Sequence, residues 1–388
     1  MMRVIVIGSG IAGLSLALAL RRVGIEATIY ERAPQLTEIG AGISLWANAF
    51  RALDCLGVGA AVRAACLPVN LSEFRTRNGH KIAGSFQTAS FERQLATTPF
   101  LAMIHRADLV ALLSKYLPAD TAHYGFECVG AETQGSRAVV RFKNGHCDEA
   151  DLVIGADGIR SAIRTTLFGA TQPRYAGYTC WRGVCDRPST VGPGYLAEWW
   201  GRGRRFGITT LPGDQVYWWA TKNEPAFERG ANERAAVTTA FQGWAGPVTE
   251  IIAATPAAAV LRNDILDRPP TRFWSKDRIG LIGDAAHPTT PNLGQGGCLA
   301  IEDAVALARH LSNGADPEAG LTSFAAERFP RTTAVTKESL RFGSIGQWEG
   351  RFATWGRDKA FELLLPLIGP KSMSKYAQFD VGHHPLVP

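Results

Sequence analysis

A glycine-rich turn near the N-terminus constrains the fold of this chain more than any other feature. Residues 3–7 are apolar after Arg3, a run typical of a buried parallel strand, and Gly8-Ser9-Gly10-Ile11-Ala12-Gly13 follows it directly. A helix over 14–23 and a second strand over 27–30 are expected next, and Glu31 ends that strand eighteen residues after the last glycine. Strand, turn, helix, strand and acid together predict a βαβ dinucleotide-binding unit.

The parts of this fingerprint predict how its ligand is held. The glycines permit a tight turn and let a pyrophosphate approach the start of the helix, where backbone N–H groups are free. Glu31 would accept hydrogen bonds from a ribose diol, and its charge disfavours a 2′-phosphate. FAD or NAD is therefore expected at this site rather than NADP.

A second glycine-rich stretch, residues 283–297, connects an apolar run at 279–282 to an Ala-rich helix at 298–309. Its glycines allow close approach to a ligand, and the N–H groups at the start of the helix would face the electron-rich edge of a planar cofactor. His287 lies in this stretch, where a lone histidine beside a turn is expected to be structural.

A third segment repeats the arrangement of a buried strand followed by a helix start. Asp157-Gly158 ends an apolar strand, and Ser161 and Arg164 follow on the first turns of the expected helix. Asp157 can cap that helix and also meet a ligand hydroxyl. Arg106, at the start of another expected helix, could contact a phosphate or simply lie on the surface.

The region between residues 175 and 267 has a different pattern, since its short strands are separated by turns and predict an antiparallel sheet. Six of the ten tryptophans lie here, between Trp181 and Trp244, which favours a planar aromatic substrate over a flexible aliphatic one. Of Trp199, Trp200, Trp218 and Trp219, neighbours on one strand should face opposite sides of the sheet.

The expected fold class is α/β, with a Rossmann-like cofactor-binding domain, a substrate domain built on a mixed or antiparallel sheet, and C-terminal helices. The corresponding boundaries are 1–70, 100–174 and 268–330 for the cofactor domain, 71–99 and 175–267 for the substrate domain, and 331–388 for the helical segment. Helices are expected at 316–342 and 354–367, with an irregular tail from Lys371.

Composition excludes several classes of protein. Among the 388 residues, 41 Lys and Arg exceed 35 Asp and Glu, but the basic residues are scattered, so anionic small molecules are expected as partners rather than nucleic acid. No apolar run is long enough for a membrane span. Seven cysteines without a Cys-x-x-Cys pair argue against a disulfide framework or a metal site, and a reducing cytoplasm is the expected location. A monomer or a homodimer is expected.

With these three motifs in this order, the chain resembles the class A FAD-dependent aromatic hydroxylases, the p-hydroxybenzoate hydroxylase superfamily. The sequence of the loop is most similar to that of the salicylate hydroxylase, zeaxanthin epoxidase and urate hydroxylase branches, and it reads Pro291-Asn292-Leu293-Gly294-Gln295-Gly296-Gly297. The resemblance implies a flavoprotein monooxygenase in which NAD(P)H, a transient co-substrate, reduces FAD. O₂ would then form a C4a-hydroperoxyflavin that hydroxylates an aromatic or heteroaromatic substrate.

The resemblance also assigns the site residues. Those expected to bind FAD are Gly8, Ser9, Gly10, Ile11, Ala12, Gly13, Glu31, Arg32, Gly42, Ile43, Arg106, Val129, Asp157, Asp284, Pro291, Gly294, Gly296 and Gly297. The carbonyl of Pro291 is expected near the reacting oxygen, and Arg205 and Tyr217 near the substrate, where Arg205 could pair with a carboxylate or phenolate. The alternative for Arg205 and Tyr217 is a position on the sheet surface.

One position departs from the resemblance. In the urate hydroxylase branch an Asp directly follows the Pro of this loop, as part of the substrate chemistry, whereas this chain has Asn292. Because Asn cannot act as a carboxylate base, the departure argues against urate. Alternative functions are a FAD-dependent epoxidase, an oxygen-independent flavin oxidoreductase, or a flavin-binding protein without catalysis.

Overall fold

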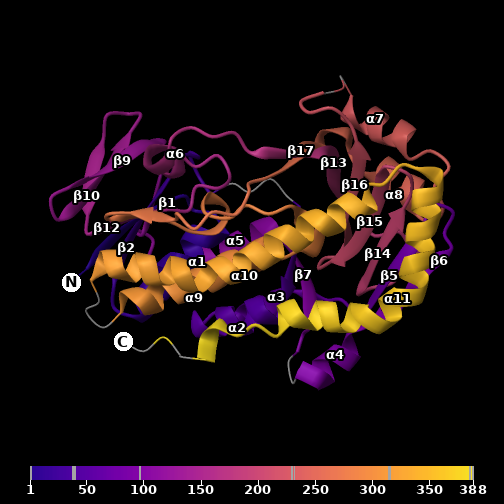
Figure 1. The fold of residues 1–388 in the computed structure, drawn as a ribbon, viewed down its shortest axis with the longest axis horizontal. Helices are drawn as coiled ribbons and strands as arrows, with labels where there is room; N and C mark the ends of the chain where they lie inside the picture. The colour runs from indigo at the N-terminus through magenta and orange to yellow at the C-terminus, as the bar shows by residue number, and fades with distance from the viewer. Residues whose placement is uncertain are drawn as a thin grey trace.

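The computed structural model describes residues 2–36, 41–95, 98–228, 230, 232–312, 316–383 and 386. Within these residues, two large sheets lie toward opposite ends of the molecule, and the long helix α10 (Pro317–Gly346) runs between them (Figure 1). One sheet is largely parallel and the other largely antiparallel. The α/β fold expected from the sequence, with long helices near the C-terminus, is confirmed.

The largely parallel sheet has the strand order β18-β19-β12-β1-β2-β8. Its strands are β1 (Arg3–Ile7), β2 (Glu26–Glu31), β8 (Ala122–Tyr124), β12 (Leu152–Gly155), β18 (Ser275–Lys276) and β19 (Ile279–Leu281). Strand β1 pairs in parallel with both β12 and β2, so the strands that precede the three glycine-rich segments lie side by side. Their apolar runs are buried, as continuous hydrophobic strands of a parallel sheet should be.

The largely antiparallel sheet has the strand order β17-β13-β16-β15-β14-β5-β6. Its strands are β5 (Leu71–Thr76), β6 (Lys81–Gln87), β13 (Arg174–Asp186), β14 (Tyr195–Trp200), β15 (Arg204–Leu211), β16 (Gln215–Asn223) and β17 (Leu261–Asp267). Only the β14–β5 pair is parallel among its described pairings.

Two small antiparallel sheets complete the strands of the described part. They are β3 (Gly42–Trp46) with β7 (Leu101–His105) and β4 (Leu67–Pro68), and β9 (Cys128–Gln134) with β10 (Arg137–Phe142) and β11 (Cys147–Ala150).

The remaining helices cover the sheets and connect them. The α-helices are α1 (Ile11–Arg22), α2 (Ala47–Cys55), α3 (Gly59–Ala65), α4 (Thr88–Leu95), α5 (Arg106–Lys115), α6 (Ala162–Phe168), α7 (Glu233–Ala240), α8 (Val248–Ala254), α9 (Gly296–Leu311) and α11 (Arg351–Ala377). The short 3₁₀ helices are η1 (Ala257–Ala259), η2 (Gly283–Ala285), η3 (Pro291–Leu293) and η4 (Val381–His383). In the described part of the chain, no helix is long and apolar enough to cross a membrane.

The two faces of the antiparallel sheet have different surroundings. The outer face, which carries Trp199 and Trp218, packs into one apolar cluster with α7 and α8. The inner face, which carries Arg205 and Trp219, lies toward the loop that precedes α9. The expected alternation of neighbouring tryptophans is confirmed, since Trp218 is buried in the outer cluster while Trp219 is only partly buried on the inner face.

The prediction of an irregular tail from Lys371 is wrong, because α11 continues to Ala377. The sequence Gly369-Pro370 favoured an earlier end. The end of the helix is held by contacts distant in sequence: Arg331 donates to the carbonyl of Tyr376 at 3.0 Å, and Arg51 donates to that of Ala377 at 2.7 Å.

A buried ionic network holds α9 against α10. Glu302 and Asp303, adjacent on α9, are fully buried, and Arg328 of α10 donates to both, at 2.6 and 2.8 Å. Asp303 also accepts from the backbone N–H of Gly283 at 3.0 Å and lies 2.5 Å from Nε2 of His287. Although burial raises the pKa of Asp303, His287 and Arg328 hold it below its ordinary value. The ionised carboxylate of Asp303 therefore stabilises the fold at pH values above the ordinary carboxyl pKa. This contribution is lost progressively as the pH falls below that value and Asp303 becomes protonated.

We expect Arg328→Met to lower the free energy of unfolding by about 3–5 kcal/mol, because two buried carboxylates lose their shared cation. Urea unfolding at neutral pH measures the change. The matched control is Lys143→Met, which breaks an exposed pair with Glu127 and should cost less than about 1 kcal/mol. Equal losses in the two variants would contradict this role of Arg328.

Candidate functional site

The three glycine-rich segments meet at one place. An ideal Cβ on Gly8 would lie 2.7 Å from the carbonyl oxygen of Ala156 and 3.2 Å from Cα of Asp157. One on Gly283 would lie 3.0 Å from Cβ of Ala12. These contacts leave no room for side chains at the two glycines, so the backbones of the three segments pack directly against one another.

Arg164 joins the segment that begins at Asp157 to the loop at residues 283–297. From α6, its Nη1 donates to the carbonyls of Ala285 and Ala286, at 3.1 and 3.2 Å. Burial and the nearby Arg268 lower the pKa of Arg164. The guanidinium therefore joins two strand ends of the parallel sheet, beside the start of α1.

The N-terminal turn leaves open space in front of the start of α1, where a phosphate could bind. Gly10 precedes α1 without a side-chain cap, and an ideal Cβ on it would have nothing within 4 Å. Gly13 is the opposite case, because its Cβ would lie 1.9 Å from the carbonyl oxygen of Gly8. Ser9 and Ile11 are buried, so the open space lies at Gly10, in front of the first N–H groups of α1.

Glu31 is held at the edge of this turn. Its Oε2 accepts from the backbone N–H of Ser9 at 2.8 Å, and its Oε1 accepts from that of Ala33 at 2.9 Å. A carboxylate offers about four acceptor positions, so capacity remains for hydroxyl groups of a ligand.

Asp157 carries an unused acceptor. Its Oδ2 accepts from the N–H of Ala162 at 2.7 Å, capping α6, while its Oδ1 is buried without a hydrogen-bond partner. Burial raises the pKa of this carboxyl, against the opposing effect of Ser161. A buried acceptor without a partner beside Gly8 fits a site that receives a hydroxyl-bearing ligand.

The loop before α9 carries Asp284 directly after Gly283, the glycine that packs on Ala12. The side chain of Asp284 is exposed, yet the protein around it raises the pKa of its carboxyl, opposed by the charges of His287 and Arg106. Arg106, the first residue of α5, is also exposed, and its backbone N–H donates to the carbonyl of Ala41. The structure thus brings Arg106 and Asp284 together from distant parts of the sequence.

Strand β3 packs between the loop and the inner face of the antiparallel sheet. An ideal Cβ on Gly42 would lie 2.6 Å from the ring of Tyr217, and one on Gly297 would lie 2.7 Å from Ile43. Gly294 has a φ of 62°, and its Cβ would meet Oγ of Ser44 at 2.4 Å, so a side chain is excluded there on both grounds.

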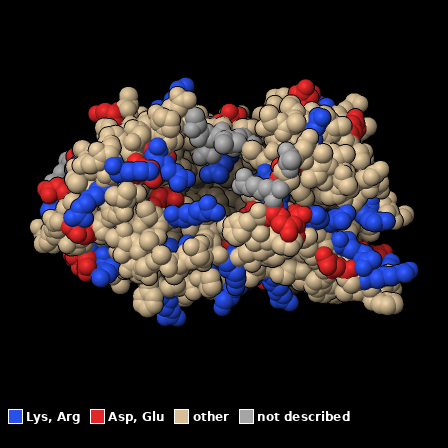
Figure 2. All heavy atoms as spheres, turned by 90° about the horizontal axis from the view of Figure 1, so that it is seen from above, with Lys and Arg blue, Asp and Glu red and all other residues tan. Residues whose placement is uncertain are grey.

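Three other residues assigned from the sequence are exposed in the structure. Arg32 and Pro291 are exposed, Val129 is 56% exposed on β9, and the carbonyl of Pro291 accepts from the N–H of Gly294. Gly296 begins α9 and has room for a Cβ, with Thr289 at 3.5 Å. Figure 2 shows a face of the molecule that is hollowed near its middle, with Lys and Arg side chains along the hollow.

Arg205 and Asn292 form a polar junction between the inner face and the loop. Arg205 is buried and donates to Oδ1 of Asn292 at 2.7 Å, to Gln347 at 2.9 Å and to Glu198 at 3.3 Å. Asn292 also donates to the hydroxyl of Tyr178 at 3.0 Å. Each of the three guanidinium nitrogens of Arg205 thus has a hydrogen-bond acceptor within the protein.

Two glycines of α10 make this junction possible. An ideal Cβ on Gly343 would lie 2.3 Å from Nδ2 of Asn292, and one on Gly346 would lie 2.7 Å from Cδ of Arg205. Neither glycine stood out in the sequence. The only sequence feature that could have indicated this close approach is a pair of glycines three residues apart on a long helix.

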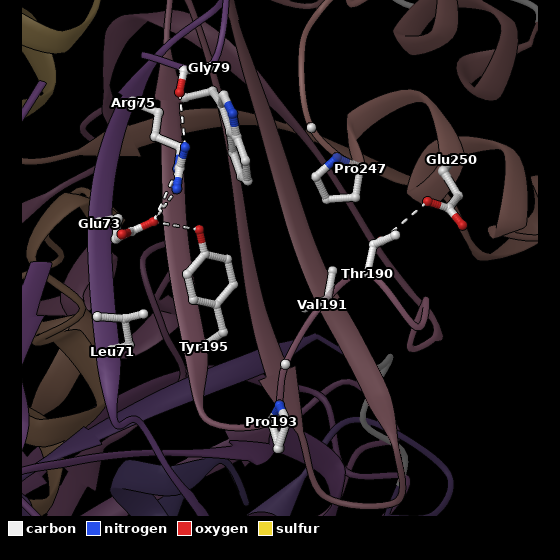
Figure 3. Close-up of a pocket in the computed structure, with 13 residues that line it drawn as sticks. Leu71, Glu73, Arg75, Gly79, Thr190, Val191, Pro193, Tyr195, Pro247 and Glu250 are labelled. Atoms are coloured by element: carbon white, nitrogen blue, oxygen red, sulfur yellow. Dashed lines mark hydrogen bonds and ion pairs between the residues drawn. The ribbon is translucent and has the colours of Figure 1, made fainter. Parts of the chain in front are cut away.

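A cavity of about 620 Å³ lies elsewhere, on the outer face of the antiparallel sheet (Figure 3). There Glu73 accepts from Arg75 at 2.7 Å and from the hydroxyl of Tyr195 at 2.8 Å. Trp199, which also lines the cavity, belongs to the outer cluster. The glycine-rich segments lie beyond the opposite face, so this cavity is separate from the candidate site.

In the part of the chain that the structure describes, no group of three or more His, Cys, Asp or Glu side chains could hold a metal ion. The unused acceptor of Asp157, the open space at Gly10 and the packed glycines instead fit an extended ligand with phosphate and hydroxyl groups.

Comparisons with known proteins agree with this geometry. A family model described as "FAD binding domain" matches residues 1–339. The chain is 41% identical over 364 residues to the aurachin C monooxygenase/isomerase of Stigmatella aurantiaca, covering 93% of this chain and 94% of that one. It is 35% identical to the FAD-dependent urate hydroxylase of Mycolicibacterium vanbaalenii, covering 79% and 78%.

Among solved structures, HpxO of Klebsiella pneumoniae complexed with FAD and uric acid superposes with a TM-score of 0.90 at 29% identity. The match covers 97% of this chain and 96% of that one.

We expect Asn292→Asp to lower the free energy of unfolding by about 1–3 kcal/mol, because the amide donors to Tyr178, Thr290 and the carbonyl of Ser339 are lost. Urea unfolding measures the loss. Asn144→Asp, in an exposed turn, is the control and should change stability by less than about 0.5 kcal/mol. A variant at position 292 as stable as the parent would show that these bonds contribute nothing.

Proposed function

The chain belongs to the FAD binding domain family of flavoprotein monooxygenases, and from that premise we propose that it uses NAD(P)H and O₂ to hydroxylate a small aromatic or heteroaromatic ring. FAD is its cofactor. When bound, FAD supplies the two-electron chemistry that accepts a hydride and activates oxygen.

The observation that carries the proposal is the meeting of the three glycine-rich segments, where Gly8 packs on Asp157 and Gly283 packs on Ala12. We assign the open space at Gly10 to the pyrophosphate and the remaining acceptor capacity of Glu31 to a ribose. Asp157 and Asp284 would accept from further hydroxyls of the cofactor. The N–H groups at Gly296 and Gly297 would stabilise negative charge on its ring system.

The other residues expected to bind FAD belong to the same proposed site. Gly42, Ile43 and Gly294 would pack against the cofactor, and Arg106 would balance its phosphates, with Arg32 and Val129 at the periphery. The carbonyl of Pro291 would face the reacting oxygen, and Tyr217 would lie beside the substrate. We also keep the expected domain boundaries and a cytoplasmic location as predictions.

Aromatic side chains on the inner face support a planar substrate. Tyr178, Tyr217 and Trp219 lie on neighbouring strands there, and the ring of Tyr217 contacts Gly42. Burial raises the pKa of Tyr217 to about 12, so its hydroxyl stays protonated at neutral pH and can donate to a substrate oxygen.

Purified protein should contain FAD, and its oxidation of NAD(P)H should accelerate with the correct aromatic compound. A screen of aromatic acids, phenols and heteroaromatics by absorbance, followed by product mass, tests this. A product heavier by one oxygen atom on the ring supports hydroxylation. An epoxide would favour the epoxidase, and an oxygen-independent turnover the reductase. FAD without any NAD(P)H turnover would leave only flavin binding.

Gly10→Val should lose most of its FAD while its FAD-free form keeps its stability within about 1 kcal/mol, because Gly10 faces open space and has a φ of −73°. Gly13→Ala should instead destabilise the protein itself by about 1–3 kcal/mol or more, since its Cβ meets the Gly8 carbonyl. Flavin absorbance and urea unfolding separate the two effects. A Gly10→Val protein with stoichiometric FAD would refute the pyrophosphate assignment.

A further inference from the structure

Arg182 is unusual among the partly buried arginines on the antiparallel sheet. It lies on β13, where it pairs with Trp219 of β16, and its side chain is partly buried. Its Nε is buried without a hydrogen-bond partner. No carboxylate of the described residues lies within ion-pair distance of it, and its polar neighbours are the thiol of Cys180 and the hydroxyls of Tyr217 and Tyr178.

Three other buried arginines of the described chain have acidic partners, whereas the buried Arg268 donates to the carbonyl of Ile159 and the hydroxyl of Thr171. Arg262 pairs with Glu224 at 3.0 Å, Arg328 pairs with Glu302 and Asp303, and Arg205 pairs with Glu198. An arginine stays protonated in proteins, and a buried charge without a partner destabilises the fold. An anion that reached Arg182 would supply the missing partner and offset this cost.

The register places Arg182 on the inner face. Trp219 pairs with both Arg182 and Gly207, and its indole lies across Gly207, whose ideal Cβ would be 2.0 Å from the ring. Because paired residues of an antiparallel sheet share a face, Arg182 lies on the same side as Trp219, away from the outer cavity.

Its neighbours tie Arg182 to the proposed flavin site. Tyr217, whose pKa responds to the charge of Arg182, packs on Gly42. Tyr178, on the same strand as Arg182, bonds to Asn292 of the loop. Arg182 thus lies near two side chains, one of which contacts β3 and the other the loop before α9. These are the two segments proposed to bind the ring system of the cofactor.

We infer that Arg182 binds an anionic oxygen of the aromatic substrate, a carboxylate or a ring phenolate, and so selects anionic ring compounds. The inference rests on the proposed function, because it needs the substrate to lie on the inner face. A planar guanidinium suits both oxygen types through charge-assisted hydrogen bonds. It also changes the expectation for Arg205, whose donors are engaged by Asn292, Glu198 and Gln347, which makes Arg205 a positioning residue.

The test is a titration of the FAD-loaded enzyme, followed through the flavin absorption spectrum. The probes are benzoate against benzamide for a carboxylate, and 4-nitrophenolate against nitrobenzene for a phenolate. The parent enzyme should bind at least one anion about tenfold more tightly than its neutral counterpart. Equal affinities within both pairs would overturn the inference without any variant.

Arg182→Met should weaken binding of the preferred anion about tenfold or more, since a charge-assisted hydrogen bond is lost. Binding of the neutral probe should change less than about threefold, and the FAD content should be unchanged. Arg182→Lys should recover part of the anion affinity, because it keeps the charge without the planar fork. The matched control is Arg187→Met, just beyond β13, where the arginine pairs with Asp214, and it should leave all four affinities unchanged.

Unchanged anion affinity in Arg182→Met would overturn the inference while leaving the proposed function intact. Failure of the proposed function has a different signature: no compound accelerates NAD(P)H oxidation, although the anions still perturb the flavin through Arg182. If Arg182→Met does not retain FAD, the comparison of charged and neutral probes in the parent and in Arg182→Lys decides the question.

Discussion

The buried ion network of Glu302, Asp303 and Arg328 is the interaction on which the site depends. It holds α9 against α10, and through the carboxylate of Asp303 it also fixes the N–H of Gly283 and the ring of His287. The start of the loop proposed to face the cofactor is therefore held in place by Asp303. His287 acts structurally here, as expected for a histidine beside a turn.

A second polar junction fixes the other end of that loop. Asn292 bonds to Tyr178 and Arg205 of the antiparallel sheet, and Gly343 and Gly346 let α10 approach both residues. The amide acts as donor and acceptor at once, which a carboxylate at neutral pH cannot do. Asn292 therefore completes a structural contact between β13, β15 and α10, which an Asp at this position could not make in the same way.

Much of the fold could be predicted because its signals are local. The glycine turn, the apolar strands of the parallel sheet and the alternation at Trp218 and Trp219 depend on residues adjacent in sequence. Helix ends were less predictable. The helix α1 begins at Ile11, within the glycine motif, and α11 continues past Pro370 because Arg331 and Arg51 bind its last carbonyls.

By itself, the sequence determined the cofactor class, since glycine spacing and the acid at position 31 depend on backbone geometry that local residues dictate. Only the tertiary structure decided which polar side chains are already paired. Arg205 and Arg182 look alike in sequence, but strand register and the approach of α10 give one a set of partners and leave the other without an acid. Pairing of charges depends on residues far apart in the chain, and sequence patterns do not record those distances.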